Sequence, residues 1–141
     1  MSRKHIIEDW YQRVWIDMDF TAIDEHFTVA TEAEGLLPDF SVGQDDFKTL
    51  VPMFRALIDN VEVSVDKVIE EGDWVSALTS TRATNPKTGS PVSGYGQLTC
   101  RFNGSKIVEA YNAFDFLSFF EQLGALPPHS LELGLTGQKI A

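Results

Sequence analysis

A carboxylate with an aromatic side chain on each side stands near the end of the chain, in the stretch NAFDF. Asp115 lies there between Phe114 and Phe116. An apolar surrounding disfavours the ionised form of a carboxyl group, and a group held in this way can accept and donate a proton near neutral pH. The alternative is that Asp115 caps a helix beginning at Phe116, by accepting hydrogen bonds from its backbone N–H groups. The residues alone leave both roles open.

Six other side chains are candidates for binding a small molecule. They are Tyr11, Trp15, His26, Phe54, Arg101 and Tyr111. Tyr11 and Trp15 fall on the apolar stripe of a predicted helix, where they line a pocket or are ordinary core residues. Arg101 belongs to a polar strand face, which is a solvent-exposed surface, a dimer surface or a pocket wall. A single helical histidine such as His26 reaches a cavity mouth or is a surface or core group.

The remaining charged and glycine-rich pieces do not indicate other chemistry. The adjacent acids 45–46 and 70–71 are expected to point apart rather than to converge on a metal ion. Gly94 and Gly96 lack the strand–turn–helix setting of a phosphate-binding loop and are expected to relieve strand curvature. We therefore expect neither a metal site nor an organic cofactor.

Helical periodicity dominates the first half of the chain. Apolar residues recur at three- and four-residue spacing from Ser2, a plausible N-cap, to Met18. A short helix over about 21–27 and an extended piece over about 28–33 follow, and a loop comes next at Gly35 and Pro38. Another helical stripe covers about 47–57, with Asp45 and Asp46 in its first turn. Pro52 should kink or shorten that helix.

From Asn60 onwards the period changes to two, which predicts strands. Expected strands cover about 61–69, 74–84, 92–102 and 106–114, and a helix covers 116–123. Short turns join the strands, including Asn103-Gly104, so they should form an antiparallel meander. In the last strand, strict alternation puts Ile107, Glu109, Tyr111, Ala113 and Asp115 on one face. Either that face is partly a polar pocket, or a bulge resets the alternation.

Length and charge limit the classes of function. The 141 residues predict one domain, over 1–126, followed by a tail over 127–141. A net charge of −10 argues against binding to nucleic acid or to an anionic membrane. The single cysteine, Cys100, cannot form an internal disulfide, and no stretch has the length of a signal peptide or membrane span. We expect a soluble, cytoplasmic protein.

Two long stretches, IEEGDWVSALTSTRAT and GSPVSGYGQLTCRFNGSKIVEAYNAFDFLSFFEQLGAL, resemble the SnoaL-like polyketide cyclase family of the NTF2-like superfamily. The resemblance implies an α+β cone, in which a strongly curved antiparallel sheet wraps around N-terminal helices and encloses a pocket. It implies that Asp115 matches the family aspartate, which shuttles a proton without metal or organic cofactor. The histidine that the cyclases carry on the preceding strand corresponds roughly to Arg101, a departure from the family pattern.

Two kinds of function follow from this comparison. One is a cofactor-independent enzyme, in which Asp115 acts as acid and base on a small hydrophobic carbonyl compound in a cyclisation, isomerisation or lyase step. The other is a non-catalytic hydrophobic ligand-binding protein or interaction module. A homodimer through the outer face of the sheet is expected by analogy with the superfamily, and the threonines 79, 81 and 99 are compatible with such a surface.

Overall fold

Six strands form a single curved sheet that does not close into a barrel. A computed structural model describes residues 1–141 and gives the strand order β2-β1-β6-β5-β4-β3. The strands are β1 (Ala33–Leu37), β2 (Phe40–Val42), β3 (Asp59–Glu71), β4 (Trp74–Thr84), β5 (Pro91–Asn103) and β6 (Lys106–Phe114). Neighbouring strands are antiparallel except β1 and β6, which are parallel. This is the α+β architecture expected from the sequence.

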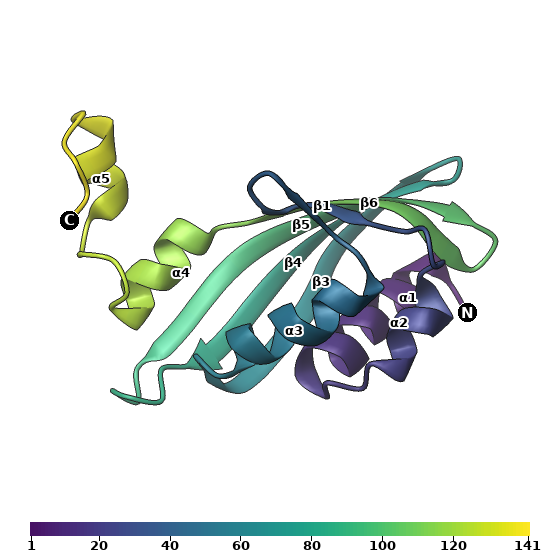
Figure 1. Cartoon of the computed structure of the whole chain (residues 1–141), viewed down its shortest axis with the longest axis horizontal. Coiled ribbons are helices and arrows are strands. Elements are labelled where there is room, and N and C mark those ends of the chain that lie inside the picture. Colours follow the sequence, from purple (N-terminus) through teal and green to yellow (C-terminus); the bar gives the residue numbers. More distant parts are fainter.

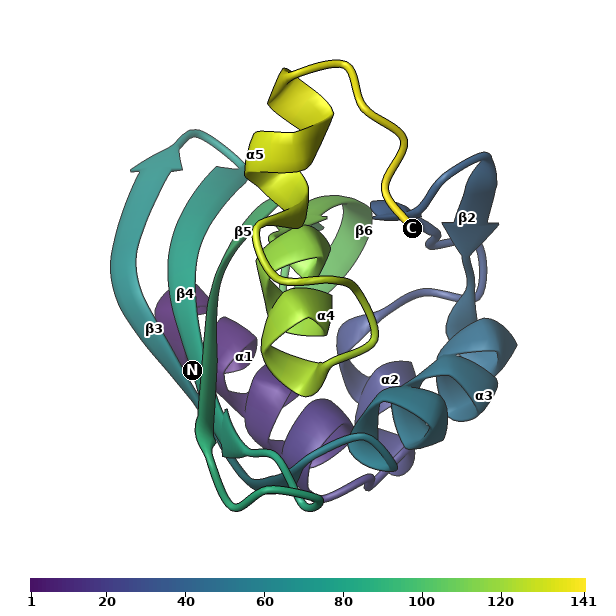
Figure 2. The same ribbon diagram turned by 90° about the vertical axis from the view of Figure 1, so that its left-hand side faces the viewer.

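The helices lie along one side of this sheet and at its end. They are α1 (Arg3–Trp10), continued by the π-helix η1 (Tyr11–Ile16), then α2 (Thr21–His26), α3 (Gln44–Arg55), α4 (Phe116–Leu123) and α5 (Ser130–Leu135). Figure 1 shows α1, α2 and α3 beneath the long strands, and α5 projecting from the body of the fold. In the end-on view of Figure 2, the sheet and these helices surround an interior that α4 partly covers. None of the helices combines the length and apolar character needed to cross a membrane.

Several predicted elements are confirmed to the residue. The strand 74–84 and the helix 116–123 have the bounds read from the sequence, and Ser2 caps α1 by accepting a hydrogen bond from the His5 N–H at 3.1 Å. Gly104 adopts a φ of +61° in the turn between β5 and β6, a conformation that favours glycine. Local signals were sufficient here because each element is bounded by a cap or a turn residue.

Several local predictions differ from the structure. The segment expected as a loop around Gly35 and Pro38 contains the β1–β2 hairpin, and the extended piece expected over 28–33 begins only at Ala33. Pro52 lies within α3, which ends at Arg55, shortly before the expected end at about 57. The first helix widens into a π-helix from Tyr11, and residues 130–135 of the tail form α5. Packing of β1 against β6 outweighs the turn signals in the first case.

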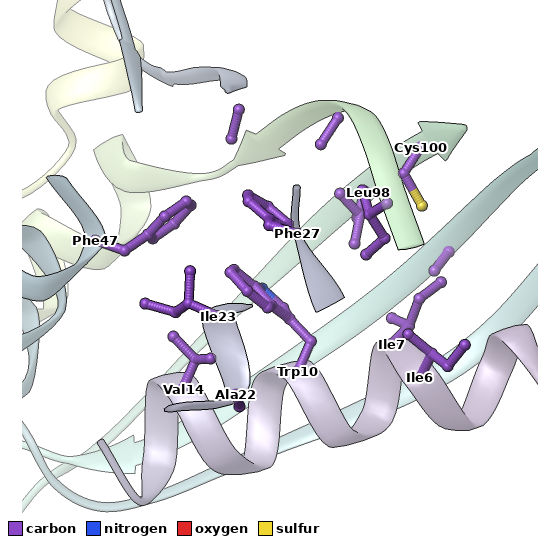
Figure 3. Packing of buried hydrophobic residues seen from close by; sticks show 14 of the residues in the cluster. Ile6, Ile7, Trp10, Val14, Ala22, Ile23, Phe27, Phe47, Leu98 and Cys100 are labelled. Carbon is purple, nitrogen blue, oxygen red and sulfur yellow. The ribbon is translucent and has the colours of Figure 1, made fainter. Parts of the chain in front are cut away.

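Aromatic rings hold the helices to the sheet in the main core (Figure 3). Trp10 stacks on Phe27 with ring centroids 4.4 Å apart, and Phe47 meets both rings edge-on at 5.2 and 5.7 Å. Ile7 and Val14, from the same face of the first helix, are fully buried. Rings packed edge to face gain energy beyond their buried area. The core therefore fixes the position of η1, which forms part of the cavity described below.

Cys100 should be unreactive in the folded protein. Its side chain is fully buried in β5, and burial raises the pKa of its thiol to about 12. At pH 8 only about one thiol in ten thousand is then the reactive thiolate. We expect no reaction with 5,5′-dithiobis(2-nitrobenzoate) at pH 8 in the native state, and one equivalent after denaturation in urea. Rapid labelling of the native protein would contradict this burial.

Candidate ligand-binding cavity

A cavity of about 100 Å³ opens between η1, the last turn of α3, the start of α4 and the inner face of the sheet. Eleven of its seventeen lining residues are hydrophobic. The aromatic part of the wall consists of Tyr11, Trp15, Phe54, Phe114, Phe116 and Phe119. The volume is that of several water molecules, and its apolar wall favours an organic ligand over water.

Few polar groups face this apolar space. Tyr11, Thr79, Thr81, Gln97 and Asn112 are neutral polar residues of the lining, and Arg55 is its one cation; no lining residue is acidic. Burial raises the pKa of the Tyr11 hydroxyl above its ordinary value, and a contact with Thr79 partly opposes this shift. Tyr11 therefore remains a neutral phenol at physiological pH. A buried phenol can donate a hydrogen bond to a ligand oxygen.

The π-helix places two aromatic residues on the cavity wall. Tyr11 and Trp15 are four residues apart and both line the cavity. The Trp15 ring packs against Phe54 and Phe47, with centroid distances of 5.9 and 6.3 Å. Arg55 ties the end of this helix to α3, since its Nη1 donates hydrogen bonds to the carbonyl oxygens of Trp15 (3.2 Å) and Ile16. Contacts within η1 and from α3 therefore support this part of the cavity wall.

Two glycines of β5 make room for the Phe114 ring in the cavity wall. A Cβ atom built at Gly94 would lie 2.7 Å from Cζ of Phe114, and one built at Gly96 would lie 2.8 Å from Oγ1 of Thr79. Both distances are shorter than real Cβ contacts allow. The glycines therefore let the Phe114 ring approach the strand backbone closely, which gives them a packing role beyond the curvature expected from the sequence.

The structure brings three of the predicted site residues together. Tyr11, Trp15 and Phe54 line the cavity, and their role in binding stays a prediction. His26, Arg101, Tyr111 and Asp115 are not among its lining residues. Arg101 donates a hydrogen bond to Glu109 at 3.1 Å, and Tyr111 donates one to the other Glu109 oxygen at 2.6 Å.

A bulge in β6 explains why these polar residues lie outside. Phe102 pairs with Ile107, but Arg101 pairs with Glu109, so Val108 is an extra residue on β6. After Val108, buried Ala110 shares its face with the cavity-lining Asn112 and Phe114. Glu109 and Tyr111 alternate onto the opposite face. Of the two possibilities that the sequence left open, the reset by a bulge is the observed one.

Asp115 continues the outward alternation and stands at the N-terminus of α4. Its Oδ1 accepts a hydrogen bond from the Ser118 N–H at 3.1 Å, and the residue is exposed. This is the geometry of an N-cap. Both neighbours, Phe114 and Phe116, line the cavity, so the Asp115 backbone lies at the cavity edge while its carboxylate faces the helix.

His26 belongs to a separate charged cluster around α2. Its Nε2 lies 2.6 Å from a carboxylate oxygen of Asp9, and Arg13 bonds to the same residue and to Glu25. Ligand atoms of Asp9, Glu25 and His26 lie within 4.8 Å of one another, a spacing that a metal ion could use. The Arg13 guanidinium already supplies a positive charge between the two carboxylates, and its hydrogen bonds lower the pKa of Glu25. Salt bridges within the cluster therefore account for the arrangement of these side chains without a metal ion.

Sequence reasoning missed several residues of the cavity. The sequence pointed to Thr79 and Thr81 only as compatible with an outer dimer surface, but both line the cavity, and Thr79 is only 3% exposed. The signal was present in the alternation of β4, since Thr79 follows the buried residues Val75 and Ala77 at two-residue steps. Arg55 gave no such signal, because a basic residue in the last turn of a helix is ordinary.

Comparison with known proteins agrees with this architecture. Residues 5–123 match the SnoaL-like polyketide cyclase family. The chain belongs to this family. No curated protein matches the sequence.

Solved structures of other proteins share the family fold. A proposed polyketide cyclase from Bacillus cereus ATCC 10987 superposes with a TM-score of 0.77 at 20% identity, covering 86% of this chain and 80% of that one. IdmH, a proposed polyketide cyclase from Streptomyces antibioticus, superposes with a TM-score of 0.74 at 18% identity, covering 88% of this chain and 99% of that one. AclR, a proposed hydroxylase from Streptomyces galilaeus, superposes with a TM-score of 0.73 at 22% identity, covering 89% of this chain and 97% of that one. At these identities the likeness establishes the fold.

Proposed function

We propose that this member of the SnoaL-like family binds a small hydrophobic carbonyl compound in the cavity and moves a proton on it, in a cyclisation, isomerisation or lyase step. One observation carries the proposal: an apolar cavity whose lining includes Tyr11, a phenol that its burial keeps protonated. Such a donor, placed against a carbonyl oxygen, stabilises the negative charge that develops when a neighbouring carbon loses a proton. The surrounding aromatic rings exclude water and strengthen that interaction.

Asp115 is the group we propose as proton carrier. Its backbone lies between Phe114 and Phe116 at the edge of the cavity. Its carboxylate would take up this role by leaving the Ser118 N–H and turning towards a bound ligand. The helix would lose one cap hydrogen bond in that state, which amounts to about 1 kcal/mol. The proposal therefore requires this exposed side chain to rotate from its cap position towards the cavity when a ligand binds.

The two roles of Asp115 can be separated by substitution. Asparagine caps helices about as well as aspartate but cannot shuttle a proton, whereas alanine does neither. We expect Asp115→Asn to keep the urea midpoint of the wild type and to slow proton transfer about a hundredfold. We expect Asp115→Ala to be equally slow and also to lose about 1 kcal/mol of stability. The measurement is the protein-dependent exchange of the α-protons of 2-tetralone in D2O, followed by NMR, with urea unfolding in parallel.

The outcomes distinguish the possible roles. Exchange by Asp115→Asn at the wild-type rate would remove Asp115 from the mechanism and leave it a cap. Tyr11→Phe is the companion variant, since it removes the donor with little change in volume. If exchange is unaffected in both variants, the proposed mechanism is wrong.

A second candidate is binding without turnover. It is favoured by the absence of an acidic residue from the cavity lining and by the hydrogen bond that holds Asp115 at α4. In that case 2-tetralone would bind, as seen by calorimetry, but its α-protons would exchange no faster than in buffer. A homodimer through the outer sheet face stays a prediction, to be tested by light scattering.

A further inference from the structure

Arg55 is the one charged residue in the cavity wall, and only part of its guanidinium has a partner. Nη1 donates to the carbonyl oxygens of Trp15 and Ile16. Nε is buried and makes no hydrogen bond. No carboxylate lies within salt-bridge distance of the side chain. Arg55 therefore contributes a positive charge that the protein itself leaves without a counter-ion.

This arrangement is unusual within the chain. The other four arginines, Arg3, Arg13, Arg82 and Arg101, each form a salt bridge with a carboxylate. Acidic residues are abundant, at 21 against 11 basic ones, but none of them lines the cavity. Cations taken out of water are normally paired, because an isolated charge in a medium of low dielectric constant is costly.

A purely structural role explains only part of this geometry. Arg55 ends α3 and holds the carbonyl groups at the end of η1, which is a common use of a cation at a helix C-terminus. That role uses Nη1 alone. It does not explain why the same side chain, with no carboxylate partner, lines an apolar cavity.

We propose that the ligand of this cavity carries an anionic oxygen, a carboxylate or an enolate, that lies beside the Arg55 guanidinium. The inference rests on the proposed function, since it concerns the same cavity, and it specifies the substrate class: a hydrophobic body with one acidic oxygen. The aromatic wall takes the hydrophobic body. The guanidinium takes the charge, in surroundings where a charge-assisted hydrogen bond is stronger than in water.

Matched pairs of probes test this substrate class by isothermal titration calorimetry at pH 7. The first pair is 2-naphthoate and the neutral 2-naphthamide. The second is 2-hydroxy-1,4-naphthoquinone, an enolate at this pH, and its neutral 2-methoxy analogue. We expect the wild type to bind at least one anion about tenfold more tightly, or better, than its neutral partner. The pair that shows the preference identifies the oxygen as carboxylate or enolate.

Substitution of Arg55 should remove the preference without removing the cavity. In Arg55→Gln the side chain keeps an N–H donor at about the place of Nε, but the charge is gone. We therefore expect each anion and its neutral partner to bind equally. Arg55→Lys keeps the charge and should keep part of the preference for the anion. This variant provides the test if Arg55→Gln does not fold. Arg82→Gln is the control, because Arg82 is exposed and paired with Glu62. This variant should show the same preference for the anion as the wild type.

The results separate this inference from the function on which it rests. Equal affinity of the wild type for anion and neutral partner in both pairs would overturn the inference alone. An undiminished preference in Arg55→Gln would also overturn it. Failure of all four probes to bind would contradict the cavity as a ligand site, and with it both proposals.

Discussion

Replacing Gly35 with alanine is expected to lower the free energy of unfolding by about 3 kcal/mol or more. Gly35 lies in β1 with a φ of +87°, a conformation that side chains rarely adopt. A Cβ atom there would lie 2.1 Å from the carbonyl oxygen of Asn112 in β6. Because that atom belongs to the backbone of a paired strand, it cannot turn aside, and β1 must move away from β6. Asn112 also lines the cavity, so ligand affinity should fall as well.

A second glycine isolates the steric part of this effect. Gly89, in the turn between β4 and β5, has a φ of +74° but no atom within 4 Å of its would-be Cβ. We expect Gly89→Ala to lose about 1 kcal/mol, the conformational part alone. Urea unfolding followed by tryptophan fluorescence measures both variants. Equal losses would mean that the contact with Asn112 is relieved at little cost and that β1 is loosely held.

Replacing Phe47 with alanine is expected to destabilise the fold by about 3–5 kcal/mol. The Phe47 side chain is only 1% exposed and meets the rings of Trp10, Phe27 and Trp15 edge-on. Alanine would leave a void among these rings. Trp10 belongs to α1, Trp15 to η1 and Phe27 to the segment after α2, so the three rings cannot all move together to fill it. Trp15 would lose an edge-on partner on the side away from the cavity, so ligand binding should weaken in any fraction that stays folded.

The matched control is another phenylalanine. Phe40 in β2 is 52% exposed, and its replacement by alanine should change the free energy of unfolding by less than about 1 kcal/mol. Thermal and urea unfolding of the two variants measure the difference. A loss of similar size at both positions would show that the aromatic core around Phe47 repacks after truncation.

Much of the fold could be predicted from local patterns in the second half of the chain. The strand from Trp74 to Thr84 alternates between the two faces of the sheet without interruption, and turn residues mark both of its ends. The β1–β2 hairpin could not be predicted in this way. Its five- and three-residue strands carry Gly35, which normally breaks strands, and they exist because β1 pairs in parallel with a strand about 77 residues later in the chain. Such pairing leaves no local signal.

The candidate site was less predictable than the fold, for two physical reasons. One extra residue, Val108, inverts every side chain after it on β6, and nothing in the sequence marks where a bulge falls. The placement of Asp115 depends on that inversion. Arg55 was missed because its importance comes from what surrounds it, an apolar cavity with no carboxylate, which is a property of the folded chain.

The wide turn of η1 would link the proposed ligand recognition by Arg55 to the main chain. Its hydrogen bonds span five or six residues, from the Asp17 N–H to the Gln12 carbonyl and from the Asp19 N–H to the Arg13 carbonyl. The carbonyl groups of Trp15 and Ile16 are thereby presented to Arg55. The cation beside the cavity is consequently positioned by peptide groups, whose chemistry is the same whatever side chains they carry. If Arg55 selects an anionic ligand as proposed, inserting or deleting a residue between 11 and 16 would alter the winding of η1 and the binding preference together.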